Sequence, residues 1–147
     1  MITTLLLADD DPDDRLLVHD ALEEASWAVD LREVEDGDEL IDYLNRRGRY
    51  ASSDESPRPG LILLDLKMPG KGGLQALEEI KRESPLSRIP IVVLTTSSAE
   101  EDIAEAYDLG ANSYIVKPSS FSTLVDAMQA LERYWLDVVR LPSTGAG

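Results

Sequence analysis

The chain of 147 residues contains no cysteine, which excludes disulfide bonds and thiol-based catalysis. It also has no long apolar stretch, because none of its apolar runs approaches the roughly 20 residues that a membrane-spanning helix requires. The first residues carry no basic side chain before a short apolar run, a pattern that argues against a signal peptide. These absences predict a cytoplasmic protein with no membrane partner.

Basic residues are few, with 14 Lys and Arg against 29 Asp and Glu, and the formal net charge is -15. A nucleic-acid surface needs a basic stripe, so we expect no nucleic-acid partner. The hydrophobic content of 43% is ordinary for a globular protein, and the length suits one domain. We expect residues 1–142 to form that domain and residues 143–147 to form a flexible C-terminal tail.

Short apolar segments alternate with helical patterns along the chain, which predicts an α/β fold on a parallel sheet. The predicted strands are residues 3–8, 29–34, 61–65, 91–94 and 113–116. Five predicted helices begin near residues 12, 37, 74, 99 and 121. In the first helix, the residues expected to face the core are Leu16, Leu17, Ala21, Leu22 and Ala25. The last helix should extend to residue 139 and bury a stripe of Phe121, Leu124, Met128, Leu131 and Trp135.

Side chains suited to phosphate chemistry stand where four of these strands end. Asp9 and Asp10 follow the first strand, and Asp65 ends the third. Thr95 ends the fourth strand and Lys117 follows the fifth. Open parallel sheets bind ligands beyond the carboxyl ends of their strands. Carboxylates suit Mg2+, while a hydroxyl and an ammonium group can each contact a phosphoryl oxygen. The sequence therefore predicts a magnesium-dependent phosphoryl site.

The acidic run continues past Asp10 into the start of the first helix. We expect Asp11 to cap that helix, and Asp13 and Asp14 to be solvated charges that the helix dipole favours. His19 lies within the helix, away from the strand ends, and we expect it to be a surface or boundary residue. Trp27 is expected to be a packing residue.

Four motifs occur in order on matching elements: LLADD at 6–10, LLDLKMPG at 63–70, VLT at 93–95 and YIVKP at 114–118. With these motifs, the sequence closely resembles the receiver domain of two-component response regulators over about residues 3–137. The resemblance implies a flavodoxin-like, doubly wound, five-stranded parallel sheet with strand order 2-1-3-4-5 and five helices. It also implies a phosphoprotein that acts as a switch in phosphorelay signalling.

The resemblance implies a role for each acid of the cluster. Asp65 corresponds to the phosphoacceptor, which takes a phosphoryl group from a histidine kinase or a phosphotransfer protein. Asp9 and Asp10 correspond to the Mg2+ acids, joined as ligands by Asp65 and by the backbone carbonyl of Lys67. The protein would then be no enzyme, its only reactions being self-phosphorylation from a donor and self-dephosphorylation.

Three more residues receive roles from the same resemblance. Lys117 would contact the phosphoryl oxygens and, with the metal, offset the repulsion between a carboxylate and an anionic donor. Thr95 and Tyr114 resemble the switch pair, in which the hydroxyl moves toward the phosphoryl group and the aromatic ring turns inward. Such contacts can bias a pre-existing equilibrium only if they are better in one state.

The polar loop at residues 46–59 and the chain ending at residues 134–142 resemble a subset of the family. Its members are single-domain regulators paired with phytochrome-type histidine kinases, and many dimerise through the fourth helix, the fifth strand and the fifth helix. No effector domain is expected after residue 142. Apolar side chains exceed what one core-facing stripe needs in the last segment, namely Trp135, Leu136, Val138, Val139 and Leu141. We therefore expect a homodimer.

Other functions fit the residues less well. A phosphorylation-independent interaction module with the receiver fold remains the alternative, although the intact site set argues against it. An aspartate-nucleophile phosphatase would need an acid two residues after Asp65, where Lys67 stands. A flavin-binding protein would need a phosphate-cradling loop where Asp9 and Asp10 would repel the flavin phosphate.

Overall fold

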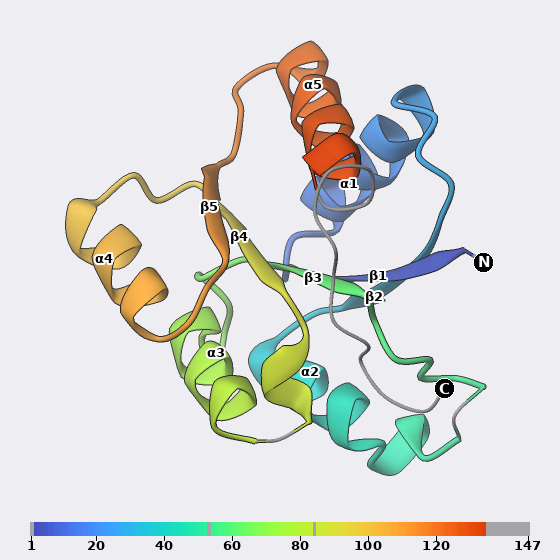
Figure 1. The fold of residues 1–147 in the computed structure, drawn as a ribbon, viewed down its shortest axis with the longest axis vertical. Helices are drawn as coiled ribbons and strands as arrows, with labels where there is room; N and C mark the ends of the chain where they lie inside the picture. Colours follow the sequence, from blue (N-terminus) through green and yellow to red (C-terminus); the bar gives the residue numbers. More distant parts are fainter. Residues whose placement is uncertain (1, 53, 84, 135–147) are drawn as a thin grey trace.

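The computed structural model describes residues 2–52, 54–83 and 85–134, and these form a three-layer α/β structure (Figure 1). The sheet has five parallel strands in the order β2-β1-β3-β4-β5. Their bounds are β1 Thr3–Ala8, β2 Val29–Val34, β3 Leu61–Leu64, β4 Ile91–Thr95 and β5 Ser113–Val116. The predicted fold class and strand order are confirmed, and so are the five strands, although β3 ends one residue before and β4 one residue after the predicted end.

Five α-helices within the described residues connect and cover the strands: α1 Pro12–Glu24, α2 Gly37–Asn45, α3 Gly73–Arg82, α4 Glu100–Asp108 and α5 Phe121–Glu132. Helices α1 and α5 lie together on one face of the sheet, and α2, α3 and α4 lie on the other (Figure 1). None of the described helices is long and apolar enough to cross a membrane.

The central strands are buried on both faces, as their unbroken aliphatic runs predicted. All four residues of β3 and all five of β4 are buried. Alternate residues of β1 enter opposite cores: Leu6 packs on the α2–α3–α4 side and Leu5 on the α1–α5 side. The central strands are therefore enclosed between the two helical layers.

The predicted core-facing set of α1 was partly wrong. Leu16 and Leu17 are 58% and 45% exposed, whereas Val18 is buried and starts the stripe that Ala21 and Leu22 continue. Because three apolar residues follow one another, the sequence pattern does not decide which of them faces the core. The packing of α1 against α5 buries Val18.

The last helix also differs from the prediction at its start. Phe121 is 42% exposed because it is the first helical residue, and the buried stripe begins at Leu124. The predicted extension of this helix to residue 139, the apolar residues expected from Trp135 to Leu141, and the domain end at residue 142 with its tail all lie outside the described residues.

The polar loop before β3 contains a short 3₁₀ helix, η1, at Gly48–Tyr50 that the sequence pattern did not predict. Tyr50 is buried against Tyr43 of α2, with ring centroids 5.1 Å apart, and its hydroxyl donates a 2.7 Å hydrogen bond to Glu39. The hydroxyl of Ser56 is also buried and donates to the backbone carbonyl of Tyr50. Part of this loop is therefore anchored on α2. A second 3₁₀ helix, η2, spans Leu86–Arg88.

Ser26 offers a direct test of backbone strain at the end of α1. It has φ 58°, a left-handed conformation, while Trp27 N–H donates to the Leu22 carbonyl and closes the helix. Glycine adopts this φ without cost, so Ser26→Gly should stabilise the protein by about 0.5–1 kcal/mol. Urea denaturation measures the change. The inverse substitution, Gly110→Ser at φ 111°, should destabilise the protein; equal midpoints for wild type and Ser26→Gly would contradict the assignment.

Candidate functional site

Parallel pairing brings the acids of β1 and β3 together. The β1–β3 register aligns Ala8 with Leu64, the last residues before Asp9 and Asp65. Hydrogen bonding continues one residue further, since Asp65 N–H donates to the Ala8 carbonyl at 2.9 Å and Asp9 N–H to the Val34 carbonyl at 3.1 Å. Backbone bonds on neighbouring strands thus fix both carboxylates at the carboxyl edge of the sheet. Both residues are buried.

Lys117 reaches the same place from β5. Its backbone N–H donates to the Thr95 carbonyl at 2.7 Å, which ties the residue to the end of β4. Its ammonium group donates to Asp9 at 2.8 Å, to Asp65 at 3.1 Å and to Asp14 at 2.8 Å. The Lys117 side chain is 12% exposed, and its ammonium is hydrogen-bonded to these three carboxylates.

Burial and pairing oppose each other in this cluster. Burial alone would lower the pKa of Lys117, but the hydrogen bonds that its ammonium donates to Asp14 and Asp9, together with the charge of Asp65, outweigh burial and raise that pKa. Burial raises the pKa of Asp9, although Lys117 and the backbone N–H of Asp11 counteract this effect. The ammonium of Lys117 is therefore firmly charged, whereas burial disfavours the ionised form of Asp9.

Three carboxylates of the cluster can converge on one cation. Asp9, Asp10 and Asp65 each offer an oxygen, and these oxygens lie within 4.8 Å of one another. Asp10 is exposed while the other two are buried, so the group opens to solvent on one side. An all-oxygen set with one open side fits a hard divalent cation such as Mg2+, which retains some of its water ligands.

Thr95 ends β4 and Tyr114 lies on β5, the two strands that follow β3 in the order of the sheet. The Thr95 hydroxyl is fully buried and has no hydrogen-bond partner among the described residues. Such a donor is costly to leave unpaired, and an incoming anionic oxygen would satisfy it. The Tyr114 ring is half-buried, and its hydroxyl donates to the Ser97 carbonyl in the loop after β4 at 2.8 Å.

Two residues of the first turn of α1 have contacts that the sequence did not predict. Asp11 caps the helix as expected, accepting from the Asp13 N–H at 2.9 Å. Asp14, predicted to be a solvated charge, instead binds Lys117. Arg15 donates to the backbone carbonyl of Asp9 at 2.7 Å. The sequence around Asp14 gave no sign of this contact beyond its place in the acidic run, because Lys117 lies 103 residues further along the chain.

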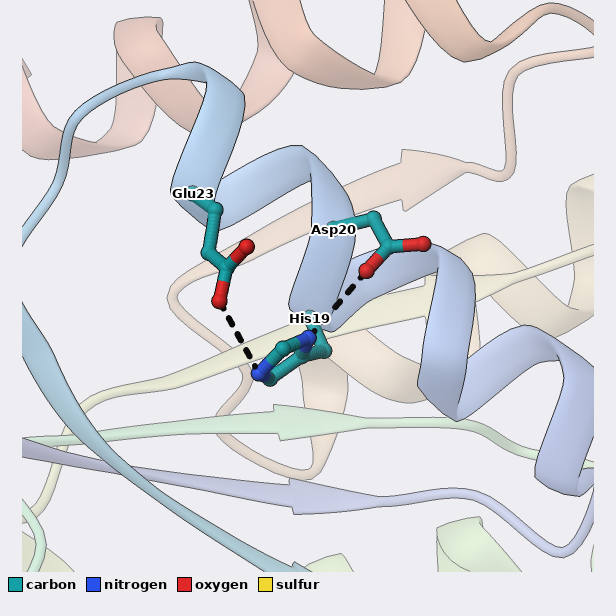
Figure 2. Close-up of side chains that lie close together, drawn as sticks. All are labelled: His19, Asp20 and Glu23. Carbon is teal, nitrogen blue, oxygen red and sulfur yellow. Dashed lines mark hydrogen bonds and ion pairs between the residues drawn. The ribbon is translucent and has the colours of Figure 1, made fainter.

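Lys67 and His19 complete the residues singled out from the sequence. The Lys67 N–H donates to Asp65 at 3.1 Å, and its side chain is exposed. His19 lies on the exposed surface of α1, as expected, between Asp20 and Glu23, with nitrogen–oxygen distances of 3.2 and 3.4 Å (Figure 2). Each imidazole nitrogen already faces a carboxylate, so this group is a surface charge network separate from the strand-end site.

Comparisons with known proteins agree with this geometry. The response regulator receiver domain family matches residues 5–129. Response regulator Rcp1 from Synechocystis is 40% identical over 139 residues, covering 95% of this chain and 92% of Rcp1. The structure of its Mn2+-bound form has a TM-score of 0.84 at 39% identity, covering 96% of this chain and 99% of that one.

Two further solved structures are similar over nearly the whole chain. The phosphorylated cyanobacterial phytochrome response regulator RcpA has a TM-score of 0.89 at 40% identity, covering 97% of this chain and 100% of that one. Response regulator RPA3017, in red light signalling of R. palustris, has a TM-score of 0.91 at 33% identity, covering 97% and 99%. With its strand order and strand-end acids, the chain belongs to the response regulator receiver family of two-component signalling proteins.

Proposed function

We propose that this response regulator accepts a phosphoryl group on Asp65. The observation that carries the proposal is the placement of the Asp65 carboxylate, buried between the Lys117 ammonium and two further acids at the open edge of the sheet. An oxygen of Asp65 forms the new bond to phosphorus while the donor's bond to phosphorus breaks. Lys117 lies 3.1 Å from Asp65 and can neutralise charge on the transferred group.

Mg2+ is the proposed metal, with Asp9, Asp10, Asp65 and the backbone carbonyl of Lys67 as its ligands. The oxygen-rich donor set of the acid group supports this choice. The Mn2+-bound form of Rcp1, a relative 39% identical to this chain, also supports a divalent cation. When bound, the cation would neutralise the anionic donor and acceptor. The chain's own residues orient the acceptor: the Lys67 N–H holds one Asp65 oxygen at 3.1 Å.

Thr95 and Tyr114 are the proposed switch residues. The buried Thr95 hydroxyl has no hydrogen-bond partner among the described residues. This supports a movement of Thr95 toward a phosphoryl oxygen, because that oxygen would accept the hydrogen bond. The Tyr114 hydroxyl binds the loop after β4, so a shift of this loop would release the ring to turn inward. Both residues would couple phosphorylation to the α4–β5 surface.

The proposed donor is a phytochrome-type sensor histidine kinase or a phosphotransfer protein. The relatives RcpA, a phytochrome response regulator, and RPA3017, a response regulator in red light signalling, support this assignment over nearly their full length. A cytoplasmic location is part of the same proposal.

A homodimer through α4, β5 and α5 is the proposed assembly. Each element carries an exposed large side chain that supports it: Tyr107 on α4, Val116 on β5 and Phe121 on α5. Strand β5 is the edge strand of the sheet, and α4 and α5 lie on opposite faces of the sheet next to this edge (Figure 1). At tens of micromolar, light scattering should report twice the 16.2 kDa protomer mass. A single-protomer mass, with and without phosphodonor, would contradict the dimer.

Mass spectrometry of the intact protein tests the phosphoacceptor. With Mg2+ and a small phosphodonor, wild type should gain one phosphoryl group and Asp65→Asn none, because an amide cannot act as the acceptor carboxylate. Asp54→Asn, at an exposed aspartate of the loop before β3, is the matched control and should behave as wild type. Equal modification of wild type and Asp65→Asn would overturn the assignment, and no modification of wild type would favour a phosphorylation-independent interaction module.

A further inference from the structure

The Lys117 ammonium is shared among three carboxylates, and one of them stands apart. Asp9 and Asp65 belong to the acid group that can converge on a cation, whereas Asp14 does not. Asp14 nevertheless binds the ammonium at 2.8 Å, as closely as Asp9 does. All three N–H donors of the lysine are thus used, one of them on a carboxylate outside the candidate metal group.

The first turn of α1 holds Asp14 in place. The Asp11 side chain caps the helix start. One residue after Asp14, Arg15 ties the same turn to the Asp9 carbonyl at 2.7 Å. The Asp14 side chain is 33% exposed, whereas those of Asp9 and Asp65 are 1% and 8% exposed. The backbone of the helix start therefore sets the position of Asp14.

A cation at Asp9 and Asp65 would compete with the ammonium for the same oxygens. Two positive charges a few ångströms apart repel each other strongly in a partly buried site. Asp14 offers the ammonium a counter-charge on the α1 side of the cluster. A cavity of about 250 Å³ adjoins it there, lined by Asp14, Lys117 and Ser119 among others, so the lysine has room to shift.

We propose that Asp14 is a positioning residue: it holds the Lys117 ammonium when the divalent cation occupies Asp9 and Asp65, so that metal and lysine can flank the acceptor together. The inference rests on the proposed phosphoacceptor site and adds a fourth carboxylate to its function. Without Asp14, the ammonium relies on Asp9 and Asp65 alone and displaces the cation more effectively.

Calorimetric titration with Mg2+ alone provides the first test. Asp14→Asn should weaken Mg2+ binding by about five-fold or more, because the ammonium then competes for the metal oxygens. Asp13→Asn removes one acid from the same helical turn, where Asp13 is exposed and does not contact Lys117, and should change the affinity by less than about two-fold. Asp14→Glu, which keeps the charge, should restore part of the affinity.

A double-mutant cycle separates positioning from simple loss of charge. In a Lys117→Met background, Asp14→Asn and Asp13→Asn should have the same effect on Mg2+ affinity, because there is no ammonium left to position. Equal effects of the two aspartate substitutions in the wild-type background would overturn the inference. So would a difference that persists without Lys117.

Phosphorylation of the same variants distinguishes this inference from the proposed phosphoacceptor function on which it rests. If wild type neither binds Mg2+ nor gains a phosphoryl group, the proposed function itself fails. If wild type does both and Asp14→Asn reacts with the small phosphodonor as fast as Asp13→Asn, only the positioning role fails. The expected result is a several-fold slower modification of Asp14→Asn at limiting Mg2+ that saturating Mg2+ largely restores.

Discussion

Replacing Lys117 with methionine should destabilise the metal-free protein by about 3 kcal/mol at neutral pH, because it leaves buried carboxylates without a counter-charge. Asp9 and Asp65 are both buried and each accepts a hydrogen bond from this ammonium. Methionine keeps most of the side-chain volume, so the loss reports on charge and not on packing. Urea denaturation without divalent metal measures the effect.

The loss of stability caused by Lys117→Met should become smaller as the pH falls. Burial already raises the pKa of Asp9 above its ordinary value of 3.8, and removing Lys117 takes away a group that lowers it. A carboxyl whose pKa is higher in the folded than in the unfolded protein binds more protons when folded. Stability of the variant should therefore recover as the pH falls from neutral toward the unfolded pKa. In wild type, this recovery should be smaller.

Mg2+ should restore part of the stability of Lys117→Met, since a bound cation replaces the lost positive charge and stabilises the folded state by mass action. Lys71→Met is the matched control: Lys71 pairs with Glu79 at a more exposed site and should cost less than about 1 kcal/mol, with no rescue by Mg2+. A Lys117→Met variant as stable as wild type at neutral pH without metal would contradict the electrostatic account of the cluster.

Gly73→Ala should destabilise the protein by about 3 kcal/mol and abolish the proposed phosphorylation of Asp65, because the added methyl group has no space. A Cβ at Gly73 would lie 2.3 Å from the Asp65 carbonyl oxygen and 2.6 Å from the Leu66 Cα. These are backbone atoms of the acceptor segment, so relief requires moving the acceptor itself. The Gly73 N–H also donates to the Leu66 carbonyl at 3.0 Å, which closes the loop onto this segment.

Gly72, the residue before Gly73, provides the control for this substitution. A Cβ at Gly72 would come no closer than 3.6 Å to the Leu66 carbonyl oxygen, an ordinary contact, so Gly72→Ala should remain near wild-type stability and accept the phosphoryl group. Urea midpoints and intact mass with Mg2+ and a small phosphodonor measure both effects. If Gly73→Ala proved as stable and as reactive as Gly72→Ala, the close packing of α3 on the acceptor segment would be wrong.

Local sequence signals accounted for the elements well where one signal dominated. The aliphatic runs of β3 and β4 predicted buried strands, and Asp11 with Pro12 predicted the start of α1. The local signals failed where the same pattern was compatible with more than one choice of buried residues. Leu16, Leu17 and Val18 could each begin a helical stripe, and only the packing of α1 against α5 decides which is buried. Likewise, nothing in a polar loop indicated that Tyr50 would be buried against α2.

The sequence by itself determined which groups stand at the strand ends, because a strand ends where its apolar run ends and parallel strands end at one edge of the sheet. Asp9, Asp10, Asp65, Thr95 and Lys117 followed from this rule. Tertiary structure alone decided how the charges pair. Asp13 and Asp14 are adjacent and chemically identical, yet only Asp14 contacts Lys117. That contact joins the start of α1 to the residue that follows β5, and these segments are about a hundred residues apart in the sequence, so only the packing of the fold brings them together.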